Sequence, residues 1–350
     1  MVKGFNEVWR EFCRKDSEIS IRYQYKSCYN NTPNSYEIGV FLQNKQTVFL
    51  SEKGYQIMKD YFNYDGKVCV VTGSSNGMGL ATTKMLVDLG AKVYAVSRSE
   101  TKVEGLAACV LCDLTKKAEV DKAFAQLPDH IDCFFGVAGL SGAKTDYVTT
   151  FNCDFTANKY ITLEYLVNRM SAGGSITYVA STAGLNWREH QKEQNAVVHA
   201  EGWEGTEKAL GKLPEISPSN FAYIYAKRCI CQFAAEQAVE LGKRGIRVNT
   251  VMPGSTQSGM KDEFEKLAGG KEALLAETGV AHRLASAEEM AGPIVFLGSD
   301  LCSFVSGVDF AVDYADTTLK KLGLKKERTN ISATNPLILK MAKKAMAKQS

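Results

Sequence analysis

Three polar residues, Ser181, Tyr223 and Lys227, combine the side-chain types needed to move a proton to or from an alcohol or carbonyl oxygen. Tyr223 and Lys227 are four residues apart on a predicted helix over residues 220–241, so their side chains share one face of it. A phenol with a pKa of about 10 is a poor base near neutrality, but a neighbouring ammonium lowers that pKa. Ser181 ends a predicted strand, and its hydroxyl can hold the reacting oxygen. The set predicts proton transfer coupled to hydride transfer at a C–O bond.

A glycine-rich segment of the pattern G-x-x-x-G-x-G begins at Gly73, between a predicted strand over 67–72 and a predicted helix over 78–89. The glycines let the backbone turn tightly and approach a pyrophosphate, while the helix N-terminus offers free N–H groups and a positive dipole end. In this strand–loop–helix setting the pattern predicts a dinucleotide site. The residues expected to contact the cofactor here are Gly73, Ser75, Asn76, Gly77, Met78 and Gly79.

The next predicted strand, 92–97, ends at Ser97 and is followed by Arg98. An acidic residue there would hold the ribose 2′-hydroxyl of NAD and repel a 2′-phosphate. The small serine leaves room, and the Arg98 guanidinium suits a phosphate, so NADP(H) is expected over NAD(H). Further contacts with the adenosine half are expected from the ends of the two following strands, at Asp113, Leu114, Ala138 and Gly139.

Apolar strands alternating with amphipathic helices must position these residues. This pattern predicts an α/β, Rossmann-type fold with a doubly wound, parallel, seven-stranded sheet. The strands are expected at 67–72, 92–97, 109–112, 131–137, 175–180, 246–252 and 308–312.

Composition divides the 350 residues into three regions. Residues 1–64 hold seven of the fifteen tyrosines and predict a small α+β appendage, with strands at 19–25, 36–42 and 47–50 and a helix at 51–62. Residues 65–315 form the predicted Rossmann domain. Residues 316–350 carry nine Lys/Arg against two acidic residues and predict a basic extension, with a helix at 338–348. The basic cluster is expected to pack on acidic groups of its own chain or of a neighbouring subunit.

Charge and cysteine usage limit the class of protein. The net charge of +3 is too small to indicate a nucleic-acid binder, and no apolar run is long enough for a membrane span. Cys109 and Cys112 lie on a predicted strand and face opposite sides, so they are poorly placed to share a metal. We expect no metal site, reduced thiols and a cytoplasmic location.

Together these motifs resemble the short-chain dehydrogenase/reductase family over residues 66–313. The resemblance implies that Tyr223 relays the proton, that Lys227 binds the nicotinamide ribose and lowers the tyrosine pKa, and that Ser181 orients the substrate. It also implies contacts with the nicotinamide end of the cofactor after the sixth strand, at Pro253, Gly254, Ser255, Thr256 and Ser258.

The sequence departs from the family pattern at the relay asparagine. That position falls on Asp154, with Asn152 and Asn158 as alternatives. Gly136 begins the segment Gly-Val-Ala-Gly where the family often has Asn-Asn-Ala-Gly, and Asp-Tyr-Ala from Asp313 replaces the usual Asp-Gly-Gly.

An insertion at 185–220 separates Ser181 from Tyr223 and resembles that of the bacterial 3α-hydroxysteroid dehydrogenase/carbonyl reductase subgroup. It is expected either to wall a wide apolar pocket or to block packing between subunits, with His190 and His199 at the surface. The resemblance implies an NADP(H)-dependent oxidoreductase of a ketone or alcohol substrate, foremost a steroid or bile acid, acting as a homo-oligomer. The alternatives are a carbonyl reductase for other ketones and a non-catalytic, cofactor-binding regulator or scaffold.

Overall fold

A computed structural model describes residues 37–41, 47–51, 61–212, 220–327, 330 and 332. The chain divides into two units, Met1–Asn63 and Tyr64–Ser350. In the first unit, β1 (Glu37–Phe41) and β2 (Thr47–Ser51) pair antiparallel with Gly39 opposite Phe49, which confirms the strands predicted there. The predicted strand at 19–25, most of the helix at 51–62 and the basic helix at 338–348 lie outside the described residues.

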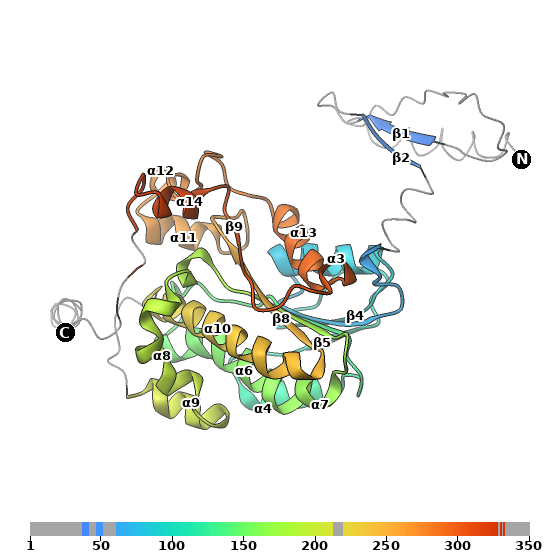
Figure 1. Cartoon of the computed structure of the whole chain (residues 1–350), viewed down its shortest axis with the longest axis horizontal. Coiled ribbons are helices and arrows are strands. Elements are labelled where there is room, and N and C mark those ends of the chain that lie inside the picture. Colours follow the sequence, from blue (N-terminus) through green and yellow to red (C-terminus); the bar gives the residue numbers. More distant parts are fainter. Residues whose placement is uncertain are drawn as a thin grey trace, which may run out of the picture. The chain divides into compact units, whose positions relative to one another are not determined.

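The second unit contains one parallel sheet of seven strands, as predicted (Figure 1). Its strand order is β5-β4-β3-β6-β7-β8-β9. Every strand end lies within two residues of the predicted one. The strands are β3 (Val68–Thr72), β4 (Lys92–Ser97), β5 (Ala108–Leu111), β6 (Cys133–Gly136), β7 (Ser175–Val179), β8 (Arg247–Pro253) and β9 (Asp309–Val312).

The strand order reverses between β3 and β6, which are neighbours although β4 and β5 lie between them in sequence. The carboxyl ends of parallel strands leave a crevice at such a reversal, and ligands of open α/β sheets bind there. All residues of β7 and β8 are buried, as expected of strands covered on both faces.

Helices cover both faces of the sheet (Figure 1). On one face α3 (Gly77–Asp88) packs against α13 (Ala287–Gly298), whose capping box is formed by Ser286 and Glu289. The other face is covered by α4 (Lys117–Phe124), by α10 (Asn220–Glu240) and by one continuous helical stretch over 147–169. No helix within the described ranges is long and apolar enough to cross a membrane.

The helical stretch over 147–169 contains two π-helical turns. Its parts are α5 (Tyr147–Phe151), η1 (Asn152–Thr156), α6 (Ala157–Ile161), η2 (Thr162–Leu166) and α7 (Val167–Arg169). All five residues of η1 are buried. Turns of this wide type occur frequently at functional sites.

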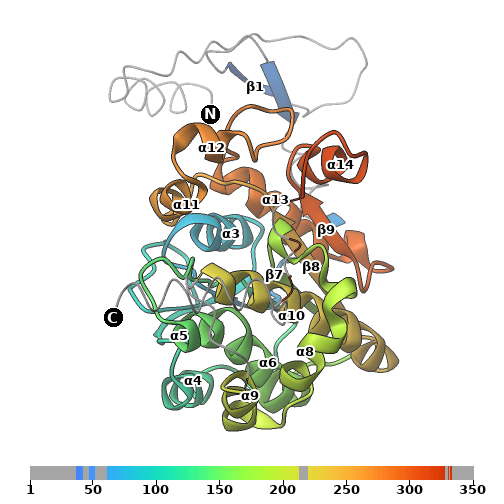
Figure 2. The same cartoon turned by 90° about the vertical axis from the view of Figure 1, so that its left-hand side faces the viewer.

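The insertion folds into α8 (Gln191–Val198) and α9 (Gly202–Leu210), which lie on α10 and on the 147–169 stretch (Figure 2). Trp203 meets the Tyr160 ring edge-on at 5.7 Å between centroids. His199 is exposed, as predicted, but the prediction for His190 is wrong: it is buried, because its Nε2 contacts Asn330 Oδ1 at 2.7 Å.

Candidate active site

The loop after β3 is shaped by two glycines that no other residue could replace without distortion. Gly73 has a φ of +70°, and a Cβ placed on it would lie 2.7 Å from the Ala138 Cα. A Cβ on Gly79 would lie 2.0 Å from the Gly73 carbonyl oxygen. Asn76 caps α3, and its side chain accepts a hydrogen bond from Gly77 N at 2.7 Å. The backbone therefore forms a close-fitting cradle at a helix N-terminus, where an anion binds favourably.

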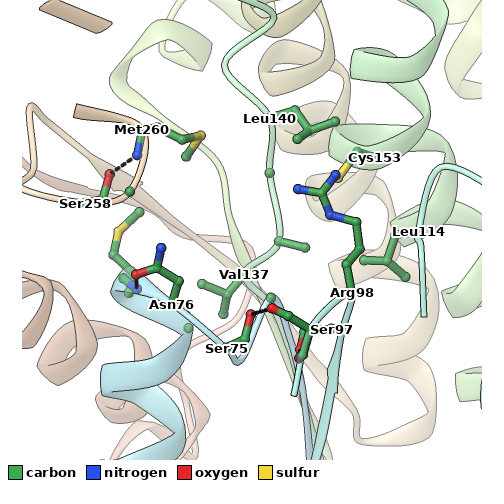
Figure 3. A pocket seen from close by; sticks show the side chains of 18 of the residues that line it. Ser75, Asn76, Ser97, Arg98, Leu114, Val137, Leu140, Cys153, Ser258 and Met260 are labelled. Atoms are coloured by element: carbon green, nitrogen blue, oxygen red, sulfur yellow. Dashed lines mark hydrogen bonds between the residues drawn. The ribbon is translucent and has the colours of Figure 1, made fainter. Parts of the chain in front are cut away.

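This cradle opens into a cavity of about 340 Å³, the glycine-loop cavity, at the reversal of the strand order (Figure 3). Twelve residues expected to bind the cofactor lie together in its lining: Gly73, Ser75, Asn76, Gly77, Met78, Gly79, Ser97, Arg98, Asp113, Leu114, Ala138 and Gly139. The cavity is therefore built as a dinucleotide requires, with a phosphate cradle at one end and hydrogen-bonding groups at the end of each strand.

Sequence reasoning missed other lining residues because they come from segments without a recognised motif. They include Ser99, Thr115, Leu140, Ser141, Cys153, Gly259, Met260 and Glu263. Ser99 and Thr115 follow predicted contacts within two residues, so proximity in sequence was an available signal. Cys153 and Glu263 come from helices distant in sequence, and only tertiary packing brings them here.

The adenosine end carries both a cation and a carboxylate. Arg98 is exposed at the rim, and Figure 3 shows its side chain extending across the cavity toward Cys153. Asp113 accepts hydrogen bonds from Thr115 N at 3.1 Å and Thr115 Oγ1 at 2.8 Å. Burial raises the pKa of Asp113, but these bonds outweigh it and lower the pKa below its ordinary value. Asp113 is therefore an ionised acceptor at neutral pH.

Ser181, Tyr223 and Lys227 also come together. Ser181 follows β7, and its hydroxyl accepts a hydrogen bond from Ala183 N at 3.2 Å and is hydrogen-bonded to Tyr223. Lys227 Nζ lies 5.5 Å from the centroid of the Tyr223 ring and donates to the Val179 carbonyl at 3.0 Å. The side chain of Lys227 is only 4% exposed, so its charge acts on the phenol with little screening by water.

Ser181 and Tyr223 face a second cavity of about 410 Å³, the Tyr223 cavity. Its walls include the apolar side chains of Ile224, Phe264, Leu267 and Leu274, and the Phe264 ring meets the Tyr223 ring edge-on at 5.3 Å. The residues expected at the nicotinamide end of the cofactor line it as well: Pro253, Gly254, Ser255, Thr256 and Ser258. Because Met78, Ser258 and Met260 line both cavities, the two cavities adjoin.

The described residues of the insertion, 185–212, contribute nothing to the lining of the Tyr223 cavity. For this part of the insertion, the expectation of a pocket wall is wrong. The physical reason is that Trp187 and Trp203 are buried against the body of the domain, and the Trp187 indole donates to Asp309 at 2.9 Å.

The C-terminal extension instead supplies part of the lining of that cavity. Asp316 and Lys320 of α14 (Asp316–Lys321) line it together with Glu277. Lys320 Nζ lies 2.7 Å from Asp316 and 3.3 Å from Glu277, and Lys325 Nζ lies 2.9 Å from Glu277. Lys320 and Lys325 thus dock on acidic groups of their own chain, which is one of the two arrangements expected for the basic cluster.

Among the three candidates for the relay position, Asp154 alone pairs with Lys227. Its Oδ2 is 3.7 Å from Lys227 Nζ. Asn152 turns toward the insertion and donates to Glu207 at 2.7 Å, whereas Asn158 donates to the Asp154 carbonyl at 3.5 Å.

The departure at Gly136 also has a local cause. A Cβ at this position would lie 2.5 Å from Asn158 Oδ1 and 2.8 Å from the Tyr178 ring.

The balance of charges around Tyr223 differs from the expectation. Burial raises the pKa of the phenol, while Lys227 and the hydrogen bond to Ser181 lower it and Asp154 raises it. The net result is a pKa above the ordinary value, so the expected lowering by Lys227 is present but outweighed. Burial lowers the pKa of Lys227, but Asp154 and Tyr223 outweigh it, and the ammonium stays charged.

This arrangement can protonate or deprotonate an oxygen placed against Ser181 and Tyr223. A nicotinamide dinucleotide, when bound in the glycine-loop cavity, supplies or accepts the hydride. In this arrangement Ser181 can orient the reacting oxygen by hydrogen bonding, Tyr223 can donate or accept its proton, and Lys227 can stabilise negative charge on the phenol. The Phe264 ring places apolar surface beside Tyr223 in the same cavity.

Comparison with known proteins agrees with this geometry. Residues 67–193 match the family pattern described as "short chain dehydrogenase", and residues 211–314 match the one described as "Enoyl-(Acyl carrier protein) reductase". A coniferyl-alcohol dehydrogenase of Pseudomonas sp. (strain HR199 / DSM 7063) is 32% identical over 252 residues, covering 71% of this chain and 95% of that protein. A (+)-borneol dehydrogenase of Salvia officinalis is 27% identical over 260 residues, covering 71% and 93%.

A solved structure has the same fold. The 3-alpha-hydroxysteroid dehydrogenase from Pseudomonas sp. B-0831, complexed with NADH, aligns with a TM-score of 0.60 at 19% identity, covering 75% of this chain and 100% of that chain. Fold, motif order and relatives agree, and the chain belongs to the short-chain dehydrogenase/reductase family, oxidoreductases that act on alcohol and carbonyl groups.

Proposed function

We propose that the chain is an NADP(H)-dependent oxidoreductase that interconverts a secondary hydroxyl and a ketone on a steroid or bile acid. The observation that carries the proposal is the position of Ser181 and Tyr223, which face a large cavity with apolar walls beside the glycine-loop cavity. A cavity of this size, with apolar side chains on part of its walls, suits a rigid, mostly hydrocarbon substrate. A solved 3-alpha-hydroxysteroid dehydrogenase has the same fold, so the fold accommodates a substrate of this class.

In the reducing direction, Tyr223 donates its proton to the carbonyl oxygen that Ser181 holds, and the nucleotide delivers the hydride to the carbon. In the oxidising direction, Tyr223 accepts the proton from the hydroxyl. The preference for NADP(H) rests on Arg98 at the cavity rim, with no acidic residue at Ser97.

A second candidate substrate is an aryl allylic alcohol. The similarity to a coniferyl-alcohol dehydrogenase favours it. Such a molecule carries a polar phenol at the end opposite the reacting alcohol, and Lys320, Glu277 and Asp316 offer polar groups in the lining of the Tyr223 cavity. A carbonyl reductase for other ketones uses the same residues and is the third possibility within this reaction class.

The experiment that tests the proposal measures oxidation and reduction of a panel of oxygenated steroids, bile acids and aryl alcohols with each nucleotide. Tyr223→Phe removes the proton donor and is expected to lower kcat about a thousandfold, with the affinity for NADP(H) unchanged. Tyr225→Phe is the matched control, because the Tyr225 hydroxyl donates to the Glu193 carbonyl at 2.8 Å, away from both cavities. It is expected to lose only about 1 kcal/mol of stability.

Absence of turnover with every steroid would remove the steroid proposal, and turnover of aryl alcohols alone would establish the second candidate. If the protein binds nucleotide but turns over no compound in the panel, the result favours the alternative of a non-catalytic regulator or scaffold.

We further propose that residues 1–64 are an appendage, that 65–315 are the enzyme domain and that 316–350 are an extension. Because α14 lines the Tyr223 cavity, part of this extension belongs functionally to the enzyme.

We also propose a homo-oligomer in the cytoplasm. Large apolar side chains are exposed around the edge strand β9, with Phe304 fully exposed and Phe310 37% exposed, and a second copy of the chain is the occupant that would cover them. The eight cysteines in the described ranges are free thiols, which suits a reducing compartment. Light scattering tests the first part of this proposal.

A further inference from the structure

The Asp154 carboxylate is a charged group inside the catalytic assembly where the family resemblance leads one to expect a neutral asparagine. Its side chain is fully buried. Oδ1 accepts a hydrogen bond from Leu140 N at 2.7 Å, in the loop that lines the glycine-loop cavity. Oδ2 faces Lys227 Nζ at 3.7 Å and has no hydrogen-bond partner among the described residues. The hydrogen bond from Leu140 thus fixes the carboxylate through Oδ1, and Oδ2 is left facing the Lys227 ammonium.

Lys227 depends on this carboxylate for charge balance. Among the described residues, Asp154 is the only acidic group that forms an ion pair with it. Its hydrogen bond goes to the neutral Val179 carbonyl, and the titratable groups beside it on α10, Tyr223 and Cys231, are both uncharged in their protonated forms. Two opposite charges that are both almost fully buried interact strongly, because little water screens them.

The π-helical turn gives Asp154 this position. All five residues of η1 (Asn152–Thr156) are buried, so the Asp154 side chain lies inside the domain. The adjacent Cys153 lines the glycine-loop cavity (Figure 3). The side-chain amide of Asn158, one regular turn later, donates to the Asp154 carbonyl at 3.5 Å and carries no charge that could balance Lys227.

We propose that Asp154 is a positioning residue whose carboxylate neutralises Lys227 and thereby holds the Tyr223 phenol in its protonated, proton-donating form. The inference rests on the proposed function, since it assigns Tyr223 the role of proton donor. A protonated phenol is the form required to reduce a ketone, whereas a phenolate is the form required to oxidise an alcohol. Near neutral pH, the carboxylate therefore favours a high rate of ketone reduction. The rate of alcohol oxidation rises as the pH rises and the phenolate forms.

The charge states of the titratable groups around the carboxylate are consistent with this role. Burial raises the pKa of Asp154 to about 6 against the lowering effect of Lys227, so the group is ionised at neutral pH. Asp154 raises the pKa of Tyr223, and Lys227 lowers it. Burial likewise raises the pKa of the adjacent Cys153, which remains a neutral thiol.

The test replaces the carboxylate by a neutral group of the same shape. Asp154→Asn keeps an oxygen for the Leu140 N–H but leaves the Lys227 charge unbalanced. We expect Tyr223 to deprotonate about one pH unit lower than in the wild type, with the rising limb of kcat/KM for alcohol oxidation shifted by the same amount. The matched control is Asp146→Asn, at the start of the same helical stretch, where asparagine still caps α5. It should leave the pH profile unchanged.

A direct titration separates this inference from the proposed function. The ultraviolet absorbance of tyrosinate is recorded against pH for the wild type and for Asp154→Asn, each with its own Tyr223→Phe version as the blank. This readout requires neither substrate nor nucleotide, so it remains decisive if no substrate is turned over. Asp154→Ser, which also removes the charge, provides a second variant if the asparagine protein does not fold.

A downward shift in both neutral variants supports the inference. An unchanged or raised Tyr223 titration in a folded Asp154→Asn or Asp154→Ser protein overturns it and assigns the carboxylate a purely structural role. A shift seen equally in Asp146→Asn also overturns it, because the effect would then follow from net charge alone.

Discussion

The glycine-loop cavity and the Tyr223 cavity share Met78, Ser258 and Met260 but are built from different kinds of structure. The first is formed at the ends of β3 to β6, and its key contacts are backbone atoms brought close by Gly73 and Gly79. The second is closed by short helices that follow β8: α11 (Lys261–Ala268), α12 (Lys271–Leu275) and α14. Its walls consist largely of side chains, including those of the ion-paired Lys320 and Glu277.

Because of this difference, we expect the two cavities to respond differently to mutation. A cradle made of backbone has few acceptable sequences, because any added atom collides with the chain itself. A wall made of side chains on short helices can be altered one group at a time while the sheet remains intact.

The largest effect is expected from breaking the backbone cradle with Gly79→Ala. Its Cβ would lie 2.0 Å from the Gly73 carbonyl, so the loop must move away from the nucleotide. We expect a loss of about 3 kcal/mol in the free energy of unfolding and of about a hundredfold in affinity for NADP(H), measured by denaturant titration and fluorescence titration. The control, Gly205→Ala in α9, has its nearest neighbour at 3.9 Å and should be neutral or slightly stabilising.

An intermediate effect is expected at the adenosine end of the same cavity. Ser97→Asp combined with Arg98→Ala should move the preference from NADP(H) toward NAD(H) about ten- to a hundredfold, because a guanidinium–phosphate contact is worth about 1.5–3 kcal/mol. The ratio of dissociation constants for the two nucleotides measures it. Arg188→Ala, an arginine stacked on Trp187 outside both cavities, is the control. Unchanged selectivity in the double variant would mean that other groups hold the 2′-phosphate.

The smallest effect is expected from the wall of the Tyr223 cavity. Lys320→Met removes one cation, while Lys325 still pairs with Glu277 and Asp316 and keeps α14 docked. We expect KM for substrates with a polar far end to rise about fivefold, corresponding to about 1 kcal/mol, with nucleotide affinity unchanged. The exposed Lys321→Met on the same helix should change neither quantity. An equal change in nucleotide affinity would show that the two cavities are not separable in this way.

The sheet and the catalytic set were predictable from sequence because both depend on local patterns. These patterns are apolar runs of strand length, a glycine loop between a strand and a helix, and a tyrosine four residues before a lysine. Each of them specifies a structure within a short segment of sequence. The seven strands and the grouping of Ser181, Tyr223 and Lys227 follow from these patterns.

What the sequence could not provide depends on packing between distant segments. Choosing among Asn152, Asp154 and Asn158 required knowledge of the π-helical turn, which alters the angle between successive side chains and has no reliable sequence pattern. The burial of His190 depends on Asn330, 140 residues later in the chain. The contribution of α14 to the Tyr223 cavity likewise arises only when Lys320 meets Glu277.

The wide turn at Asn152–Thr156 also has a consequence for chain length. A π-helical turn accommodates one residue more than an α-helical turn, so deleting one residue there would restore regular helix while the segments on either side kept their neighbours. The domain would fold, but the carboxylate would leave its place beside Lys227. Loss of a single codon at this point would therefore remove the charge beside Lys227 without unfolding the domain, and comparing helix lengths among homologues would reveal which of them lack the inward-facing group.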